Sequence, residues 1–323
     1  MSGEIIYQTS SGKSDANQPV SPVLAHLRFW RHSLWRYYVF SLRRHVPAAV
    51  RRSVGRLYAG YVFWRLSPRV TDWVGTRYRR SRDRIDIDIT WNCNLRCFHC
   101  NRSCQQAPTE EHMTVGQVRR FLQETLDRGV RWKKIHLIGG EPTLHPQFDE
   151  ILAMMLEFRR GHSPGTNVMV TTNGFGPEVN DVLARIPAEV DLRNTRKTSR
   201  RQDDFIPFNL APRDSAEYAR TDFRNACCVT RDAGIGLTPN GYYPCVGAGS
   251  IDRIFGFDCG RKTLPDPEDG MLEDLTRFCS LCGFFRLNYT SEVRMGPLLS
   301  ETWRKAYEAW HTQPPELTRY PEC

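Results

Sequence analysis

Short segments of this 323-residue chain alternate apolar and polar residues, and each of them predicts a β-strand. The clearest segment alternates isoleucine with aspartate. The predicted strands are residues 84–90, 134–138, 167–171 and 189–193. Residues 234–245 predict a β-hairpin with Asn240 and Gly241 in its turn, because both residue types tolerate positive φ.

Segments with helical spacing of apolar residues separate these strands. One helix is expected to begin at Thr114, where Gln117 completes a capping box, and to end near Gly129. Further helices are predicted at residues 148–159, 177–185 and 301–310. Strands that alternate with helices are typical of parallel βαβ units, so the predicted fold class is α/β.

A cysteine triplet follows the first predicted strand directly. Cys93, Cys97 and Cys100 have the spacing C-x-x-x-C-x-x-C. Three thiolates can hold three irons of a [4Fe–4S] cluster and leave the fourth iron open for a ligand. The alternative is a zinc knuckle without its fourth ligand, although zinc sites usually pair one C-x-x-C with another.

Two further motifs come after the next two strands. They are the run Gly139, Gly140, Glu141 and Pro142, and the run Thr171, Thr172, Asn173 and Gly174. Together with the cysteine triplet, they make residues 83–200 resemble the radical S-adenosylmethionine (SAM) enzymes. The resemblance implies a partial (β/α)6 barrel, of which four units are readable. It also implies a [4Fe–4S] cluster, SAM, and a reductant such as flavodoxin or ferredoxin.

The same resemblance gives the motif residues roles at the cofactor. Gly139 and Gly140 are expected to let the backbone approach the methionine end of SAM, and Glu141 to accept hydrogen bonds from its ammonium group. Thr172 and Asn173 are suited to the ribose or the carboxylate.

Two further positions near the cofactor are less typical. His99 takes the place of the aromatic residue that usually leans on the adenine, with Phe98 beside it. Arg193 and Lys197 are expected to hold the SAM carboxylate or an anionic group of the substrate, and a basic surface loop is the alternative.

A second group of cysteines lies downstream and resembles the auxiliary-cluster extensions called twitch and SPASM. The expected ligands of this second [4Fe–4S] cluster are Cys228, Cys245, Cys279 and Cys282. Cys227 is the substitute for Cys228, Cys259 is held in reserve, and a structural zinc site on the same thiolates is the alternative. Cys104 is interpreted as a bystander near the first cluster, and Cys323 as a tail thiol.

The N-terminal part differs in composition. Residues 1–20 are polar and predicted to be disordered, whereas residues 21–82 are rich in arginine and aromatic residues and predict two basic amphipathic helices broken near Pro47. This extension has three interpretations: contact of residues 21–80 with an anionic membrane, a nucleic-acid arm, or a helical cap on the enzyme. Nucleic acid is the least favoured partner. No apolar run is long enough to span a bilayer, and no secretion signal is readable.

Net charge and cysteine usage agree with a cytoplasmic enzyme, with peripheral contact to the inner membrane surface left open. The formal charge is +9, mostly from the N-terminal part, and the 11 cysteines are clustered as metal ligands rather than disulfides. The expected domains are residues 1–20, 21–82, 83–222 (radical SAM core), 223–285 (auxiliary cluster domain) and 286–323.

The predicted reaction is hydrogen abstraction by a 5′-deoxyadenosyl radical. The expected substrate is a small polar metabolite of the sugar or aminocyclitol type, which is oxidised or epimerised. A peptide or lipid substrate is the alternative. A different class also stays open, namely a non-catalytic iron–sulfur or zinc protein with a nucleic-acid-binding arm.

Overall fold

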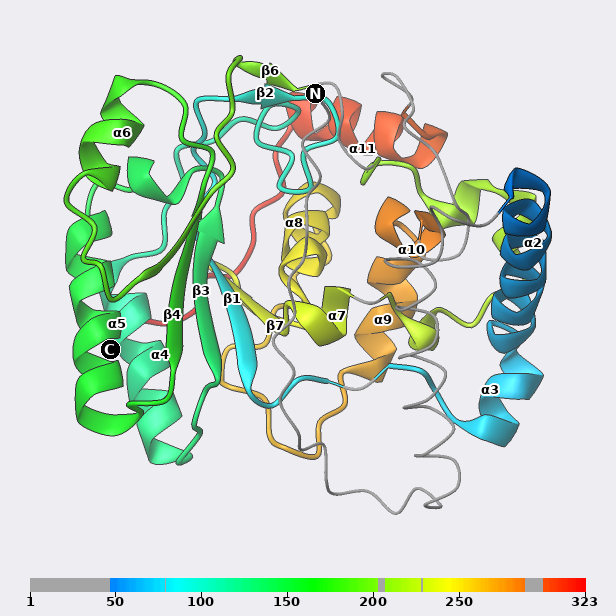
Figure 1. Ribbon diagram of the computed structural model, residues 1–323, viewed down its shortest axis with the longest axis horizontal. Coiled ribbons are helices and arrows are strands. Elements are labelled where there is room, and N and C mark those ends of the chain that lie inside the picture. The colour runs from blue at the N-terminus through cyan, green and yellow to red at the C-terminus, as the bar shows by residue number, and fades with distance from the viewer. Residues whose placement is uncertain (1–46, 79, 203–206, 228, 288–298) are drawn as a thin grey trace. The chain divides into compact units, whose positions relative to one another are not determined.

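The computed structural model describes residues 47–78, 80–202, 207–227, 229–287 and 299–323 (Figure 1). The chain divides into two compact units, Met1–Val62 and Phe63–Cys323. In the smaller unit only residues 47–62 are described. From Ala48 on they belong to helix α2 (Ala48–Arg65), which confirms the second predicted N-terminal helix. The first predicted helix and the tail of residues 1–20 lie outside the described residues.

The larger unit begins earlier than the core predicted from residue 83. Leu66 is buried, and the Asn225 side chain donates to Thr71 Oγ1 at 2.8 Å. Leu66 and Thr71 therefore pack with the rest of this unit, and the predicted boundary at residue 82 stays a prediction. The other predicted boundaries, at residues 222 and 285, stay predictions.

The centre of this unit is a six-stranded sheet in the order β5-β4-β3-β1-β7-β8. Its strands are β1 (Arg84–Thr90), β3 (Lys134–Gly139), β4 (Asn167–Thr172), β5 (Asp191–Asn194), β7 (Ile235–Thr238) and β8 (Gly241–Tyr243). All neighbouring pairs are parallel except β7 and β8. The α/β class and the four predicted strands are confirmed, whereas closure into a six-unit barrel stays a prediction.

The predicted hairpin is present but its turn is shifted by one residue. Thr238 pairs with Gly241, so Pro239 and Asn240 form the turn, and of the two predicted turn residues only Gly241 has positive φ, at 125°. A Cβ on Gly241 would lie 2.5 Å from the carbonyl oxygen of Arg261. The hairpin also extends the main sheet, because β7 pairs with β1.

The helices that link the strands begin where the sequence predicts them, but two of them end two or three residues from the predicted position. They are α4 (Val115–Asp127), α5 (Phe148–His162) and α6 (Pro177–Leu183). Thr114 and Gln117 form the predicted capping box, with both reciprocal hydrogen bonds present. Gly129 follows α4 with φ of 60°, the left-handed conformation that commonly ends a helix.

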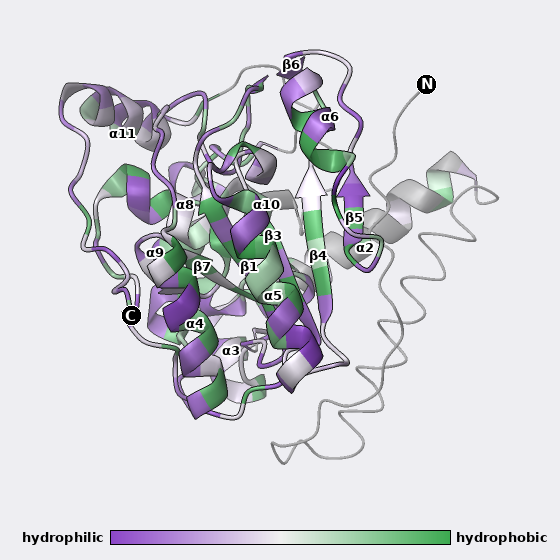
Figure 2. Ribbon diagram, turned by 90° about the vertical axis from the view of Figure 1, so that its left-hand side faces the viewer, coloured by the Kyte–Doolittle hydropathy of each residue, from purple (hydrophilic) through white to green (hydrophobic). Residues whose placement is uncertain are grey.

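The two faces of the sheet differ in chemistry. Ile85, Ile87 and Ile89 are fully buried in the apolar core beneath α4 and α5, whose polar residues lie on their other sides (Figure 2). Asp86 and Asp88 alternate with them and belong to the opposite face. Helix α8 (Val246–Phe255) covers part of that face, on the other side of the sheet from α5 (Figure 1).

The remaining elements surround this core. They are α3 (Pro68–Val74), β2 (Arg96–Cys97), η2 (Pro142–Leu144), β6 (Arg201–Gln202), η3 (Pro212–Asp214), η4 (Ala216–Tyr218), η5 (Phe223–Asn225), α7 (Val229–Asp232), α9 (Leu272–Cys279), α10 (Gly283–Leu287) and α11 (Glu301–Thr312). A second buried cluster, which includes Phe208, Tyr243 and Trp303, lies between α8 and α11. No helix in the described part of the chain has the length and apolar character needed to cross a bilayer.

Candidate functional site

Loops from the carboxyl ends of β1, β3 and β4 meet at one edge of the sheet, as parallel pairing requires. The loop after β1 holds the cysteine triplet, and we call residues 91–107 the cysteine loop. The backbone N–H of Gly140 donates to Thr90 O and that of Glu141 donates to Asn92 O, both at 2.8 Å. The glycine motif is therefore bonded directly to the start of the cysteine loop.

Close backbone contact explains both glycines. A Cβ on Gly139 would lie 2.3 Å from Thr90 O, and a Cβ on Gly140 would lie 2.1 Å from Asn92 O. Neither separation is possible for a real side chain. The structure thus gives these glycines a reason that the sequence did not predict, which is packing against the cysteine loop. The predicted approach to SAM stays a prediction.

Glu141 is fully buried and binds two loops together. One carboxylate oxygen accepts from Thr143 N at 3.3 Å and from Thr143 Oγ1 at 2.7 Å, and the other accepts from Asn173 N at 2.7 Å. The Thr172 hydroxyl is a further donor. Burial raises the pKa of Glu141, and these hydrogen bonds oppose the rise. A carboxylate offers about four lone-pair sites, so the protein itself fills them.

Asn173 joins the third motif to the cysteine loop. Its Nδ2 donates to Asn94 Oδ1 at 2.8 Å, and its Oδ1 accepts from Phe175 N at 2.7 Å. Asn94 in turn donates to Phe175 O at 2.6 Å. The structure therefore brings together the three motifs that the sequence singled out. In it the side chains of Glu141 and Asn173 are hydrogen-bonded to other groups of the protein.

The thiols of the cysteine loop interact with one another. The Cys104 thiol is hydrogen-bonded to the sulfurs of Cys100 and Cys93, and this raises the pKa of Cys104 and lowers that of Cys100. Burial, together with the neighbouring thiols of Cys100 and Cys93, raises the pKa of Cys97 to about 12. Cys104, interpreted from sequence as a bystander, is thus in contact with two of the predicted ligands.

His99 has a different environment from the predicted one. Its ring is 1% exposed, and its Nδ1 lies 2.6 Å from Asn209 Oδ1. The half-buried Phe98 has the Arg201 guanidinium over its ring at 4.4 Å. In this structure His99 contacts the protein interior, and its stacking on adenine stays a prediction.

A basic segment runs beside the cysteine loop. Strand β6 pairs with β2, and Arg96 N donates to Arg200 O at 2.7 Å. The Lys197 ammonium opposes the rise in the pKa of Cys97, so this charge is near that thiol. Arg193 is half-buried on β5 next to Thr171. The basic residues of this segment are Arg193, Arg196, Lys197, Arg200 and Arg201.

The polar face of the sheet carries a network that the sequence reading missed. His136 lies between Asp86 and Thr171, with its Nδ1 3.1 Å from Asp86 Oδ1 and its Nε2 2.8 Å from Thr171 Oγ1. Lys134 forms an ion pair with Asp86 at 3.1 Å. Although burial acts to raise it, the pKa of Asp86 is held below its usual value by His136 and Lys134.

Asp88 extends this network to the cysteine loop. Its carboxylate accepts from Arg102 Nε and Nη2, and the ion pair is 3.1 Å long with both side chains buried. Burial keeps the pKa of Asp88 above its usual value despite this partner. A signal for these residues was present, because two aspartates in a strand flanked by other parallel strands indicate a buried polar face.

The downstream cysteines converge on another position. Cys227, Cys245, Cys279 and Cys282 line one cavity of about 20 Å³, together with apolar side chains. Burial raises the pKa of Cys282 to about 12 and also holds the pKa of Cys279 well above its usual value. Cys228, the predicted ligand, lies outside the described residues, so Cys227 is the neighbour that the structure places with the other three. Cys259 does not line this cavity.

Two observations test whether the cysteine groups fit iron–sulfur clusters. No three His, Cys, Asp or Glu side chains among the described residues surround a position for a single metal ion. A cubane has a different requirement, since each cysteine binds a separate corner iron. The sulfurs of each group gather at a position of their own. The buried Tyr78 hydroxyl, which interacts electrostatically with Cys245 and Cys279, has no hydrogen-bond partner. Each cysteine group thus offers the thiolate donors that an iron–sulfur cluster takes.

Comparison with known families bears on the first group of cysteines, which is the triplet in the cysteine loop. The family model of the radical SAM superfamily matches residues 87–192, which include the triplet, the glycine motif and the third motif. Residues 87–192 form a radical SAM domain. The presence of this domain supports an enzyme of the radical SAM type, the class that the sequence predicted.

Curated relatives match about a third of the chain. GTP 3′,8-cyclase of Nautilia profundicola is 32% identical over 101 residues, which cover 31% of this chain and 30% of the relative. The enzyme of that name from Campylobacter curvus is 30% identical, covering 38% of each chain. The one from Chlorobaculum tepidum is 35% identical, covering 30% of this chain and 28% of the relative. The match thus spans well under half of each relative.

Solved structures give weaker similarities. BtrN in complex with AdoMet and 2-DOIA is 14% identical, with a TM-score of 0.38, and the match covers 68% of this chain and 97% of BtrN. SuiB of Streptococcus suis, bound to the precursor peptide SuiA, is 20% identical with a TM-score of 0.25, covering 33% of this chain and 23% of SuiB.

Proposed function

We propose that this protein binds a [4Fe–4S] cluster through Cys93, Cys97 and Cys100 and uses it with SAM to start a radical reaction. The observation that carries the proposal is the convergence of three motifs at the carboxyl ends of β1, β3 and β4. The hydrogen bond from Asn173 N to the Glu141 carboxylate joins the loops after β3 and β4, and the bond from Asn173 Nδ2 to Asn94 Oδ1 connects them to the cysteine loop. When bound, the cluster and SAM supply reductive cleavage to a 5′-deoxyadenosyl radical.

The protein residues position and shield this chemistry. Glu141 fixes the relative position of the glycine motif and the third motif, because its carboxylate accepts from both. Contact with the SAM ammonium requires that one of these internal donors gives way. Gly140 keeps the cysteine loop against β3, which a side chain at that position would prevent.

A small polar metabolite is the substrate class that we propose. The polar face of the sheet carries Asp86, His136 and Asp88, and Arg102 joins Asp88 to the cysteine loop. A polar face beside the site disfavours an apolar lipid chain. The basic segment beside the cysteine loop suits the SAM carboxylate or an anionic group of the substrate. The curated relatives are named for GTP, which is itself a small anionic molecule.

The outcome of the reaction depends on what the downstream group of cysteines binds. We place an auxiliary [4Fe–4S] cluster of the twitch or SPASM type at Cys245, Cys279 and Cys282, with Cys227 or Cys228 as the fourth ligand. Such a cluster can accept an electron from a substrate radical, which favours oxidation over epimerisation. A structural zinc ion on the same thiolates is the alternative, and metal analysis separates the two.

Other parts of the proposal follow from the enzyme class. The reductant is a small electron carrier such as flavodoxin or ferredoxin, and the location is the cytoplasm. Contact of residues 21–80 with an anionic membrane is proposed from their composition alone. Peptide or lipid substrates, and a non-catalytic metal protein, are the competing proposals.

The decisive experiment is reductive SAM cleavage by protein reconstituted with iron and sulfide without oxygen. We expect the Cys97→Ala variant to form no 5′-deoxyadenosine, because the cluster loses one of three ligands. The control is Cys323→Ala, which changes an exposed thiol far along the chain and should leave cleavage intact. Cleavage retained by the Cys97→Ala variant would contradict the assigned ligand set.

A further inference from the structure

A single buried guanidinium, that of Arg253 on α8, contacts both ends of the cysteine loop. Its Nη1 donates to Ala107 O at 2.9 Å, and its Nη2 donates to Arg102 O at 2.8 Å and to Ser103 O at 3.5 Å. At the start of the loop, the guanidinium lies over the Trp91 ring, 5.0 Å from the centroid. All three predicted ligands of the first cluster lie between these contacts in the sequence.

The charge of Arg253 lacks a close carboxylate partner. The residue is 5% exposed, and among the residues that the structure describes no carboxylate forms an ion pair with it. Arg102 is buried to a similar extent, at 6% exposed, but has Asp88 as its counter-ion. A guanidinium stays protonated in proteins, and a buried charge without a partner is costly. Arg253 therefore lacks the compensation that a buried charge needs.

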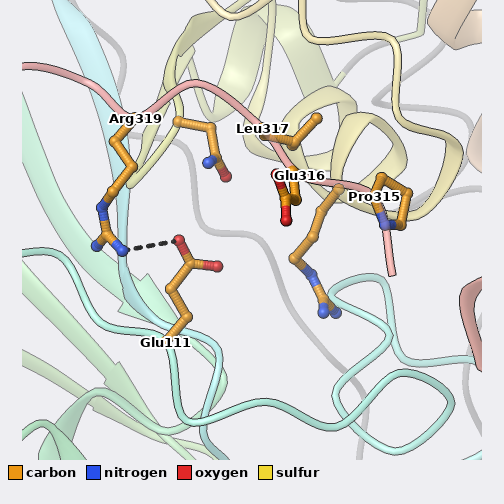
Figure 3. A pocket seen from close by; sticks show the side chains of 7 residues that line it. Glu111, Pro315, Glu316, Leu317 and Arg319 are labelled. Carbon is orange, nitrogen blue, oxygen red and sulfur yellow. Dashed lines mark ion pairs between the residues drawn. The ribbon is translucent and has the colours of Figure 1, made fainter. Parts of the chain in front are cut away.

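The carboxylates beside Arg253 have other surroundings. Arg253 lines a pocket of about 310 Å³ that also contains Glu111 and Glu316. Figure 3 shows Glu111 directed to Arg319, with which it forms an ion pair at 3.6 Å. Glu316 is exposed, so solvent screens its charge. Neither carboxylate is a close partner of Arg253.

Thiols of the cysteine loop are the other groups that interact electrostatically with Arg253. Burial lowers the pKa of Arg253, and the Cys104 thiol is the group that most opposes this change. Glu111, Tyr307 and Cys100 oppose it to a smaller extent. A thiol that binds a metal is deprotonated, so Cys100 becomes a lasting negative charge when a cluster binds. Cluster binding would thus bring Arg253 the negative charge that the protein alone does not supply.

We propose that Arg253 is a positioning residue for the first cluster, which it serves through its contacts and through its charge. The contacts hold the two ends of the cysteine loop in place. With three thiolate ligands the oxidised cluster has a net negative charge, and reduction adds an electron, so a buried cation nearby favours the reduced form. This inference rests on the proposed function, because it requires a cluster at Cys93, Cys97 and Cys100.

The role of the charge is tested by the reduction potential of the first cluster in the full chain, reconstituted without oxygen. EPR spectra recorded during a redox titration follow the reduced cluster, and the signal that the Cys97→Ala variant lacks identifies it. We expect Arg253→Met to lower the equilibrium constant for reduction about tenfold, which is about 59 mV for one electron. Arg253→Lys keeps the charge and should change this constant less than about threefold. The control is Arg119→Met, which removes the same charge at an exposed position on α4 and should leave the constant unchanged.

The hold on the cysteine loop is tested in the full chain before any cluster is added. The amides of Ser103 and Ala107 donate to Cys100 O and Ser103 O within the loop, at 2.9 and 2.8 Å. We expect both Arg253→Met and Arg253→Lys to speed hydrogen exchange at these two amides about tenfold, because an ammonium cannot reproduce the planar fork of donors. Arg119→Met should leave their exchange unchanged.

The results separate failure of this inference from failure of the proposed function. A wild-type chain that takes up no iron at the triplet overturns both. A normal wild-type cluster whose potential is unshifted by Arg253→Met, or is shifted as much by Arg253→Lys, overturns the role of the charge alone. Unchanged exchange in both variants overturns the hold on the loop. If Arg253→Met does not fold, Arg253→Gln removes the charge with a smaller change in polarity, and the same shift is expected.

Discussion

At the scale of single residues, Glu141 shows how a motif can be identified correctly and assigned a different contact. Its position after the second strand marked it as a ligand for an ammonium group. The structure fills its carboxylate with donors from Thr143, Asn173 and Thr172 instead. Sequence can place a carboxylate in a loop, but only the fold shows which backbone N–H groups surround it.

The Glu141→Gln variant should therefore be destabilised even without cofactor. Glutamine retains one acceptor oxygen and introduces an NH₂ group opposite a donor, which leaves buried N–H groups unpaired. We expect a loss of about 1–3 kcal/mol in the free energy of unfolding. Denaturant titration measures it, and hydrogen exchange should show faster exchange at the Asn173 amide. The control is Glu178→Gln on the exposed surface of α6. Unchanged exchange at Asn173 would disprove the positioning role.

Asp86 gives a prediction about pH. Its pKa is lowered in the folded state by His136 and Lys134, so the charged form stabilises the fold above the usual pKa of 3.8. This contribution is lost as the pH falls through the lower folded value. Between about pH 5 and pH 3, the wild-type protein should lose stability more steeply than the Asp86→Asn variant. Denaturant titrations at several pH values test this. Asp149→Asn, at an exposed ion pair, is the control, and parallel pH profiles for wild type and Asp86→Asn would refute the prediction.

At the scale of elements, local signals predicted β1, β3, β4 and α4 because each carries its own pattern or cap. The alternation in 84–90 gave the strand, but the polar face it leaves was not recognised, since burial of Asp86 and Asp88 depends on what covers them. The observed β7–β8 turn lies one residue before the predicted turn. A turn register is set by strand pairing, here Thr238 with Gly241, which the local sequence does not specify.

At the scale of the whole molecule, prediction was weakest where contacts are long-range. The sequence predicted the hairpin at 234–245 but not its partner, and β7 pairs with β1 across about half the chain. Tail residues 315–319 carried no motif, and they close a pocket because they run against the β7–β8 turn and Glu111. Pairings between distant segments depend on the packing of complete surfaces, so periodicity in one segment cannot reveal them.

The second cysteine group gives the prediction that belongs to this scale, because the thiols that line its cavity, from Cys227 to Cys282, span 55 residues of sequence. If Cys245, Cys279 and Cys282 hold an auxiliary cluster, the Cys282→Ala variant should lose about half of the iron per chain while the first cluster stays. The matched control is Cys259→Ala, because Cys259 does not line the shared cavity. Elemental analysis of protein reconstituted without oxygen measures iron and zinc together.

The possible results of that analysis separate three ligand assignments. Iron halved in Cys282→Ala and unchanged in Cys259→Ala fits the cavity seen in the structure. Zinc lost in place of iron assigns the same thiolates to a structural ion, since zinc and iron–sulfur sites can share a four-cysteine set. Iron unchanged in Cys282→Ala removes this residue from both sites. In that case the raised pKa of the Cys282 thiol, about 12, describes a buried side chain that remains protonated.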